Sequence, residues 1–253
     1  MDARPRVYIV GAGPGDPELM TVKGSRLLAG ADVVVYAGSL VNESVLSICR
    51  DDCEKLNSID MTLEEQTDVM TKAALAGKSV VRLHTGDPSL YGAISEQIAA
   101  LSSGGVGFEI VPGVSSLQAA ASRLGIEYTV PDGTQTLICT RVSGRTPVPE
   151  LEDIERLASH GASLVVFLSA GMAEAVAEKC IAAGMRRDTP AAWIYRATWS
   201  DERARVTTLE DLPRSMRESG IHNHALIVVG DCLARDPSSR SFLYSSEFQG
   251  ARA

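Results

Sequence analysis

The chain has 253 residues, of which 45% are hydrophobic and 22% are charged, and its formal net charge is -8. Such a chain can bury a real hydrophobic core and form one large domain or two of modest size. The negative charge argues against a general nucleic-acid binder, no apolar run is long enough to span a bilayer, and residues 1–10 lead into a strand rather than a signal peptide, so we expect a cytoplasmic protein with neither nucleic-acid nor membrane partners.

In the first half of the chain, apolar runs that end in glycine alternate with amphipathic stretches. The predicted buried strands are residues 6–13, 32–38, 79–86 and 108–113. The predicted helices, where apolar positions recur at helical spacing, are residues 17–31, 62–78 and 94–105. Strand and helix in alternation predict a mostly parallel sheet covered on both faces, with functional loops beyond the carboxyl ends of its strands.

After residue 112 the alternation changes. A helix predicted at 112–125 and a connector at 126–135 precede a second series of strands with fewer helices between them. These predicted strands are residues 136–144, 163–171, 191–198, 204–212 and 224–233. We expect the last two to pair antiparallel in a mixed sheet. The sequence therefore predicts an α/β protein with two α/β domains, 1–112 and 113–235, followed by a polar tail at 236–253.

The first strand ends in a glycine-rich loop, Gly11-Ala12-Gly13-Pro14-Gly15, that is similar to a dinucleotide-binding fingerprint without matching it. Its spacing is G-x-G-x-G, and Pro14 lacks an amide donor for a phosphate. Asp16 and Glu18 would place negative charge beside the phosphates, and no acidic residue clearly ends the second strand. A dinucleotide site is therefore disfavoured, and the alternative is a tight turn into a helix opened by Pro17 and Glu18.

The third strand of the first half ends in the stretch HTGDPSLYG, residues 84–92, which turns through Gly86, Asp87 and Pro88. We expect the carboxylate of Asp87 to be exposed, without a buried partner, and suited to bond a ligand hydroxyl or ammonium group. An ordinary Asp-Pro turn accounts for the same residues equally well.

Gly113, Ser115 and Ser116 stand at the start of the segment predicted to be helical at 112–125. Their hydroxyl and amide groups can cap that helix or meet a ligand carboxylate, and capping alone is the commoner outcome.

Four arginines of the second half fall in or near loops: Arg141, Arg145, Arg196 and Arg203. Taken singly, each is more often a surface residue than a ligand contact. Arg141 and Arg145 follow the end of a predicted strand, which makes them the favoured candidates for binding an anion.

Neither a metal site nor a catalytic triad is indicated. The cysteines are odd in number and scattered, at Cys49, Cys53, Cys139, Cys180 and Cys232. Cys49 and Cys53 are close together, but no second pair or adjacent histidine completes a zinc site, so inert thiols are expected. The histidines show no metal spacing and no assignable Ser–His–acid triad; they are His84, His160, His222 and His224.

Six stretches then occur in order: VYIVGAGPGDPELMTVKG, ADVVVYAGSLV, RLHTGDPSLYGAISEQ, EIVPGVSSLQAAA, TLICTRVSGRTPVPE and YRATWSDERARVTTLEDL. Together they resemble the cobalamin-pathway tetrapyrrole methyltransferases, which share a fold with uroporphyrinogen-III methyltransferase, siroheme synthase and diphthine synthase. The resemblance covers nearly the whole chain, and the combination of motifs is specific although no single motif is. The segments YAGSLV, TRVSGRTPVPE and ATWSDE are most similar to the branch that methylates C11 of precorrin-4 or cobalt-precorrin-4.

The resemblance implies a fold like that of the class III SAM-dependent methyltransferases. S-adenosyl-L-methionine (SAM) is then expected in a cleft between the domains and becomes S-adenosyl-L-homocysteine, while the tetrapyrrole lies over a trough lined by the glycine-rich loop. The implied cofactor contacts are Pro14, Gly86, Asp87, Leu90, Tyr91, Ser115, Ser116, Leu168, Ala197, His224 and Ala225. Asp16, Arg141 and Arg145 are candidates for positioning the substrate, and no catalytic base is assigned. A homodimer is the usual assembly in the family.

Several alternatives stay open on the residues alone. Within the family they are a cobalt-containing substrate or another ring methylase such as uroporphyrinogen-III methyltransferase, whereas the segment TRVSGRTPVPE disfavours diphthine synthase. Outside the family they are a nicotinamide-dependent oxidoreductase and a non-catalytic SAM-binding module.

Overall fold

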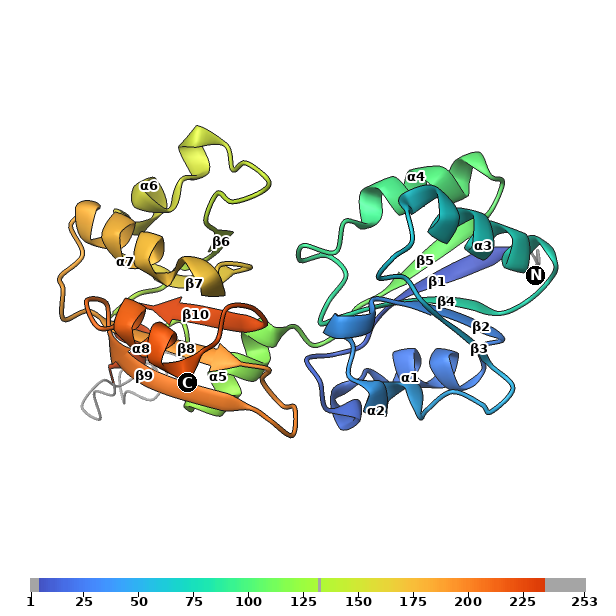
Figure 1. Ribbon diagram of the computed structural model, residues 1–253, viewed down its shortest axis with the longest axis horizontal. Coiled ribbons are helices and arrows are strands. Elements are labelled where there is room, and N and C mark those ends of the chain that lie inside the picture. The colour runs from blue at the N-terminus through green and yellow to red at the C-terminus, as the bar shows by residue number, and fades with distance from the viewer. Residues whose placement is uncertain (1–4, 132, 235–253) are drawn as a thin grey trace, which may run out of the picture. The chain divides into compact units, whose positions relative to one another are not determined.

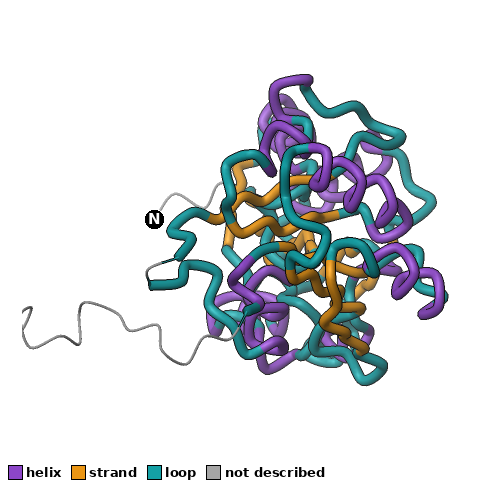
Figure 2. Tube along the Cα trace, turned by 90° about the vertical axis from the view of Figure 1, so that its left-hand side faces the viewer, coloured by secondary structure: helices purple, strands orange, loops and turns teal. Residues whose placement is uncertain are grey.

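The computed structural model describes residues 5–131 and 133–234, so the predicted tail at 236–253 lies outside the described residues. The chain packs as two compact units (Figure 1). Unit 1 contains the chain as far as Ala119 together with Thr198–Ser200, and unit 2 contains Ala120–Ala197 and the chain from Asp201 onward. Each unit combines strands with helices and loops (Figure 2).

Unit 1 is built on a five-stranded parallel sheet in the order β3-β2-β4-β1-β5. Its strands are β1 (Arg6–Gly11), β2 (Val33–Tyr36), β3 (Glu54–Asn57), β4 (Val80–His84) and β5 (Gly107–Val111). Gly11 of β1 is in register with His84 of β4, and Val10 is in register with Val111 of β5. The carboxyl ends of β1, β4 and β5 therefore meet at one edge of the sheet, where functional loops are expected.

Helices cover both faces of this sheet, as predicted (Figure 1). On one face, α1 (Val22–Ala29) and α2 (Glu43–Leu46) pack over a core that includes Val34, Val81 and Leu83. On the other face, α3 (Leu63–Leu75) and α4 (Ile94–Ser103) cover Val33, Val35 and Val80. Buried aliphatic residues on both sides of β2 and β4 are the pattern of a parallel sheet enclosed by helices.

The prediction of a single helix over residues 17–31 is wrong in one respect, because the structure has two separate helical segments there. Pro17–Leu19 form a short 3-10 turn, and the backbone at Met20 and Thr21 is extended. Thr21 then begins α1 as its N-cap, since its hydroxyl accepts a hydrogen bond of 3.1 Å from the amide of Gly24. The apolar spacing in the sequence continues across this break, although α1 begins only after its N-cap Thr21.

Unit 2 contains a mixed five-stranded sheet in the order β6-β7-β10-β8-β9. Its strands are β6 (Leu137–Arg141), β7 (Ser163–Phe167), β8 (Pro190–Tyr195), β9 (Arg203–Thr208) and β10 (Ala225–Val229). β6 and β7 run parallel, whereas the other neighbouring pairs are antiparallel. The mixed sheet is therefore confirmed.

The expected pairing of the last two strands with each other is wrong, because β8 lies between β9 and β10. β9 is antiparallel to β8, and β10 is antiparallel to both β7 and β8. The physical reason is burial: all five residues of β10 are buried, which suits a central strand, whereas polar β9 has no buried residue and occupies the edge.

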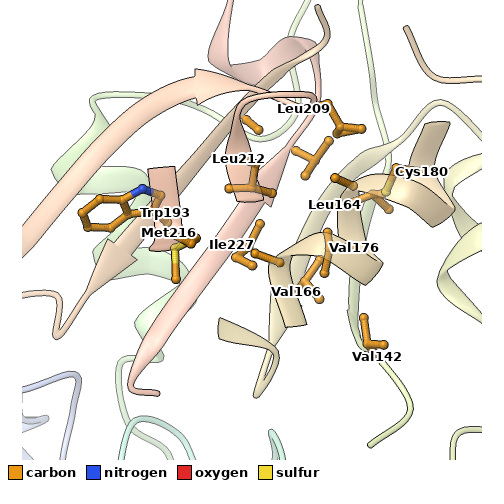
Figure 3. Packing of buried hydrophobic residues seen from close by; sticks show 14 of the residues in the cluster. Val142, Leu164, Val166, Val176, Cys180, Trp193, Leu209, Leu212, Met216 and Ile227 are labelled. Atoms are coloured by element: carbon orange, nitrogen blue, oxygen red, sulfur yellow. The ribbon is translucent and has the colours of Figure 1, made fainter. Parts of the chain in front are cut away.

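Three helices, α6 (Ile154–Ala158), α7 (Ala173–Ala182) and α8 (Leu212–Ser219), cover one face of the second sheet, with α7 in contact with both of the others. Their apolar side chains meet those of β7, β8 and β10 (Figure 3). The labelled members of this core are Val142, Leu164, Val166, Val176, Cys180, Trp193, Leu209, Leu212, Met216 and Ile227. The helix predicted at 112–125 is α5 (Ser116–Leu124), and among the described helices none is long and apolar enough to cross a membrane.

Candidate functional site: the loops at the carboxyl edges of the two sheets

Three loops touch backbone to backbone where β1, β4 and β5 of unit 1 end. A Cβ atom added at Gly11 would lie 2.5 Å from the carbonyl oxygen of Gly86 and 2.6 Å from Cα of Gly113. A Cβ added at Gly113 would lie 2.1 Å from the same Gly86 oxygen. Only glycine permits this approach, so Gly11 and Gly113 serve the packing of loop on loop.

The glycine-rich loop is further tied to the loop after β4. The amide of Gly86 donates to the carbonyl of Gly13 at 2.8 Å, and the amide of Gly13 donates to the carbonyl of Gly86 at 3.3 Å. Both glycines have positive φ, 76° and 60°. The amide of Ala12 donates to the carbonyl of His84 at 2.7 Å, and Pro14 has no amide proton. These donors already have partners, which agrees with the expectation that the loop is a poor phosphate cradle.

Asp16 is the N-cap of the 3-10 turn Pro17–Leu19. Its Oδ1 accepts a hydrogen bond of 2.9 Å from the amide of Glu18 in the 3-10 turn, and its own amide donates to Oγ1 of Thr198 at 3.0 Å. A role of Asp16 in positioning the substrate stays a prediction.

Thr198 and Trp199 hold this loop, and the sequence motif that contains them gave no hint of it. The indole Nε1 of Trp199 donates to the carbonyl of Pro14 at 2.8 Å. A Cβ added at Gly15 would lie 2.2 Å from Cδ1 of the same indole ring. The only available signal was a tryptophan within an otherwise polar loop sequence.

The carboxylate of Asp87 joins two of the predicted cofactor loops. Oδ1 accepts from the amide of Ser89 at 2.8 Å and from its hydroxyl, and Oδ2 accepts from the amide of Gly113 at 2.9 Å. Partial burial would raise the pKa of Asp87, but the bonds from the Ser89 hydroxyl, the Gly113 amide and the Ser89 amide outweigh it and hold the pKa below its usual value. The expectation of an exposed acid without a partner is therefore wrong.

Ser115 is buried and caps α5. Its Oγ accepts a hydrogen bond of 3.2 Å from the amide of Leu117, and its carbonyl accepts from the amide of Gln118 at 3.1 Å. Ser116 is the first residue of α5. Capping, the commoner of the two predicted outcomes, is confirmed for Ser115.

The predicted contacts of unit 2 lie along one edge of its sheet. Leu168 follows the end of β7, Ala197 follows β8 closely, and His224 immediately precedes β10, which is antiparallel to both strands. Ala225 pairs with Tyr195, and the amide of Arg196 donates to the carbonyl of His224 at 3.0 Å. Within unit 2 the structure thus brings together residues separated by more than fifty positions in the sequence.

Backbone strain coincides with these predicted positions. Among the described residues, the non-glycine positions with positive φ are Tyr91, Ala93, Leu168, Arg196, Thr198 and His224. Three of them are predicted cofactor contacts, and Arg196 and Thr198 flank a fourth, Ala197. Such conformations are unfavourable and tend to be kept at ligand sites. The side chains of Tyr91 and Leu168 are also 44% and 68% exposed, so they are accessible to a ligand.

The predicted residues differ in accessibility. Tyr91 and Leu168 are exposed. The half-buried ones are Asp16, Asp87, Leu90, Ser116, Arg141 and His224. The buried ones are Pro14, Gly86, Ser115, Ala197 and Ala225. The buried group contributes backbone and shape, whereas the exposed pair offers apolar surface to a flat ligand.

The two favoured arginines differ. The guanidinium of Arg141 donates to the carbonyls of Thr146 and Pro147 at 2.9 Å and 2.7 Å, so it shapes its own loop. Arg145 is exposed and, within the described part of the chain, has no hydrogen-bond or ion-pair partner. Of the two, Arg145 is thus the one whose charge is available to a ligand.

A second pair of arginines flanks one aromatic ring. The guanidinium carbons of Arg196 and Arg203 lie 5.3 Å and 5.1 Å from the ring centre of Tyr195. Arg196 also pairs with Asp201 at 2.8 Å. Burial and the positive charge of Arg196 lower the pKa of His224, although Asp201 opposes this. The sequence did not favour Arg196 or Arg203 over Arg141 and Arg145.

A buried polar cluster beneath the loop after β4 was also missed. Arg82 donates from Nε to Oε1 of Gln97 at 3.1 Å and from Nη1 to the carbonyl of Val35 at 3.2 Å. Nε2 of buried His84 has no hydrogen-bond partner among the described residues. Burial and the nearby Arg82 lower the pKa of His84 to about 3, and burial lowers that of Arg82 to about 10.

A shallow hollow lies elsewhere in unit 2. It has a volume of about 470 Å³ and contains none of the predicted cofactor contacts. Its lining is Arg123, Trp193, Arg203, Ala204, Arg205, Ser215, Glu218 and Ser219. The described residues form no cluster of three or more potential metal ligands.

The comparison with known proteins identifies the class. A model of the tetrapyrrole (corrin/porphyrin) methylases matches residues 6–213. The chain belongs to this family of methyltransferases, and the resemblance found in the sequence is confirmed.

Individual members of this family are similar to the chain over nearly its full length. The chain is 49% identical to the cobalt-precorrin-4 C(11)-methyltransferase of Methanocaldococcus jannaschii, with 98% of this chain and 96% of the relative covered. It is 40% identical to the precorrin-4 C(11)-methyltransferase of Mycobacterium tuberculosis, with 98% and 99% covered.

Solved structures agree. A cobalt precorrin-4 methyltransferase described as a cobalamin biosynthetic enzyme superposes with a TM-score of 0.89 at 48% identity, covering 92% of this chain and 96% of that one. The uroporphyrin-III C-methyl transferase of Thermus thermophilus, solved with S-adenosylhomocysteine, has a TM-score of 0.77 at 33% identity and covers 90% and 99%. The two-sheet α/β fold predicted from the sequence is confirmed.

Proposed function

We propose that this protein transfers the methyl group of SAM to C11 of precorrin-4 or of cobalt-precorrin-4. The observation that carries the proposal is similarity over nearly the full chain to enzymes of both names, at 49% and 40% identity. The higher identity to the cobalt-precorrin-4 enzymes makes the cobalt-containing ring the first substrate to test.

Each sheet edge, taken by itself, offers groups that suit part of a SAM molecule. Tyr91 in unit 1 and Leu168 in unit 2 each present an exposed side chain from strained backbone, which suits contact with a flat adenine. The amino end of α5, capped by Ser115, offers amide groups and a favourable dipole to a carboxylate. Asp87 is ionised at neutral pH, because its pKa is held low, and so favours a cationic ligand nearby.

The chemistry needs positioning more than proton transfer. Bound SAM supplies an electrophilic methyl group on a sulfonium. Fixing the two reactants in line contributes up to ~7–11 kcal/mol in favourable cases, so the rigid loops that hold them can account for a large part of the rate. The interlocked loops after β1, β4 and β5 provide that rigidity.

For the tetrapyrrole, we propose that residues 13–16 of unit 1 contact the ring and that Arg145 and Arg141 of unit 2 bind its carboxylates. The loop offers shape rather than charge, and exposed Arg145 offers a free guanidinium. Asp16 is then beside the ring with one oxygen committed to the amide of Glu18.

We also propose that the protein is a cytoplasmic homodimer, as its family resemblance suggests. Light scattering coupled to size-exclusion chromatography tests the assembly. A mass equal to one chain would contradict it.

The decisive experiment incubates the protein with methyl-labelled SAM and, in parallel, precorrin-4, cobalt-precorrin-4 and uroporphyrinogen III, and then locates the label by NMR. We expect label at C11 of one or both of the first two rings. Label on uroporphyrinogen III alone would indicate a different ring methylase. Saturable SAM binding without methyl transfer to any ring would indicate a non-catalytic module.

A further inference from the structure

Thr198–Ser200 belong to unit 1, although the residues on both sides of them belong to unit 2. They form the middle of the connection between β8 and β9. In unit 1 their partner is the glycine-rich loop after β1, which the proposed function places against the tetrapyrrole.

Three contacts fix this loop at consecutive residues. Nε1 of Trp199 donates to the carbonyl of Pro14 at 2.8 Å, and Oγ1 of Thr198 accepts from the amide of Asp16 at 3.0 Å. Between them, the indole ring occupies the space that a side chain at Gly15 would need, with Cδ1 only 2.2 Å from an added Cβ. The backbone of residues 14–16 is therefore held on one side by two hydrogen bonds and an aromatic ring.

Thr198, which accepts one of these hydrogen bonds, has a strained backbone conformation. Its φ is 70°, a conformation that β-branched residues seldom adopt. Strain of this kind persists where surrounding contacts impose it and is common at functional sites. The strain and the three contacts occur in the same short segment, which points to a role beyond connecting two strands.

We propose that Thr198 and Trp199 are positioning residues that set the conformation of the glycine-rich loop for the tetrapyrrole. The inference rests on the proposed function, because it requires the ring to lie against that loop. Neither residue is assigned to the reacting atoms. Their main effect is expected on the tetrapyrrole KM and on kcat, because the loop that they hold is the one placed against the ring, whereas the loops of Tyr91 and Ser116 keep their own contacts.

The first test removes each hydrogen bond while it keeps most of the side-chain volume. Trp199→Phe keeps an aromatic ring and removes the bond to Pro14, and Thr198→Val keeps the shape and removes the acceptor for Asp16. We expect kcat/KM for the tetrapyrrole to fall roughly fivefold to tenfold in each, the usual effect of one lost hydrogen bond. Thr198→Ser keeps the hydroxyl and should restore most of the loss. Wild-type tetrapyrrole kinetics in both variants would overturn the proposal.

The second test uses Gly15, whose φ is not in the left-handed region, so alanine there meets the indole without straining its own backbone. Gly15→Ala should lower tetrapyrrole kcat/KM, and adding Trp199→Ala should recover part of that loss. Gly30→Ala is the matched control, because its added Cβ lies 3.5 Å from its nearest neighbour, an ordinary contact. Failure of Trp199→Ala to relieve Gly15→Ala would show that the indole does not set the loop.

A third readout does not depend on turnover. The chain has two tryptophans, so Trp193→Phe leaves Trp199 as the sole indole reporter. In that background Gly15→Ala should shift the Trp199 emission maximum, whereas Gly30→Ala should not. An unshifted spectrum would refute the contact itself, while a shift with no methylation of any ring by the wild-type protein would refute the proposed function and keep the contact.

Discussion

At Asp87, each carboxylate oxygen accepts hydrogen bonds from a different segment: Oδ1 from Ser89 in its own turn and Oδ2 from Gly113 in the loop after β5. An aspartate that closes its own turn is common, but one that also joins a second loop is part of the architecture of the site. Its low pKa reports these bonds, since they favour the charged form.

We expect Asp87→Asn to lower the free energy of unfolding by ~1–3 kcal/mol, because one backbone amide loses its acceptor. Because the pKa of Asp87 is lower in the folded chain than the unfolded value of 3.8, its ionised carboxylate stabilises the fold above that pH. The difference in stability between the wild type and Asp87→Asn should therefore shrink as the pH falls below 3.8 toward the folded pKa. Urea titrations of both proteins between about pH 7 and pH 3 test this, with Ser89→Ala as the control that removes only the hydroxyl bond. Equal stability of wild type and Asp87→Asn at neutral pH would contradict the tether.

His84 gives a pH dependence of the same direction, at higher pH. Its folded pKa is lowered from 6.5 to about 3, so the unfolded chain binds a proton first as the pH falls. Stability should therefore be full above about pH 6.5 and decline below it, by at most about 1.4 kcal/mol per pH unit. His84→Gln should remove that slope between about pH 6.5 and pH 4, as measured by urea unfolding. Parallel slopes for the two proteins would show that His84 becomes protonated without penalty in the fold.

Leu168 combines a φ of 53° with a side chain that is 68% exposed. We expect Leu168→Gly to change stability by less than about 1 kcal/mol, because relief of the left-handed strain offsets the flexibility of glycine. SAM affinity should fall by roughly tenfold or more through the lost apolar contact. Calorimetric titration with SAM and thermal melting measure the two effects. A strong loss of stability with unchanged SAM affinity would assign Leu168 to packing.

Among the elements, the well-buried strands were the most predictable. β1, β2, β4 and β10 are mainly apolar and end near glycine or a turn, so periodicity and composition agree, although β4 also contains buried Arg82. β3 was not predicted, since its sequence EKLN is short and polar and forms an exposed edge. The order of β8, β9 and β10 depends on which strand gains most from burial, a comparison that local patterns do not make.

The candidate site was predictable only in part, for a related reason. Loop positions followed from strand ends, and the resemblance supplied residue types, but contacts such as Asp87 with Gly113 and Trp199 with Pro14 join segments far apart in sequence. The positive φ angles of Tyr91, Leu168 and His224 were likewise not predicted from the sequence. Leucine and tyrosine in particular seldom adopt the left-handed backbone conformation.

The junction of the loops after β1, β4 and β5 makes a prediction at the scale of elements. Gly113→Ala should lower the free energy of unfolding by ~1–3 kcal/mol or more, because its Cβ would collide with the carbonyl of Gly86. Gly107→Ala at the start of β5 is the matched control, since its nearest neighbour would be 3.5 Å away. Denaturant unfolding of both variants gives the comparison, and similar stabilities would refute the close approach.

For the whole molecule, binding and catalysis can be tested separately. A ligand that binds only the folded state stabilises it by about 2.7 kcal/mol at a hundredfold excess over Kd. We therefore expect both SAM and S-adenosylhomocysteine to raise the Tm, and NADH at the same concentration to leave it unchanged. Thermal melts with the three ligands measure this. A rise with NADH alone would revive the oxidoreductase alternative that the glycine-rich loop argues against.

The backbone contacts of Gly11, Gly86 and Gly113 also bear on how such a site can change during evolution. A gene library randomised at these three positions should return little but glycine after selection for folding, since two have no room for a side chain and the third has a φ of 60°. Variation in ligand preference is then confined to the tips that follow, where Pro14, Leu90 and Ser116 stand. Directed evolution toward a different ring should diversify those tips and leave the junction as an invariant frame.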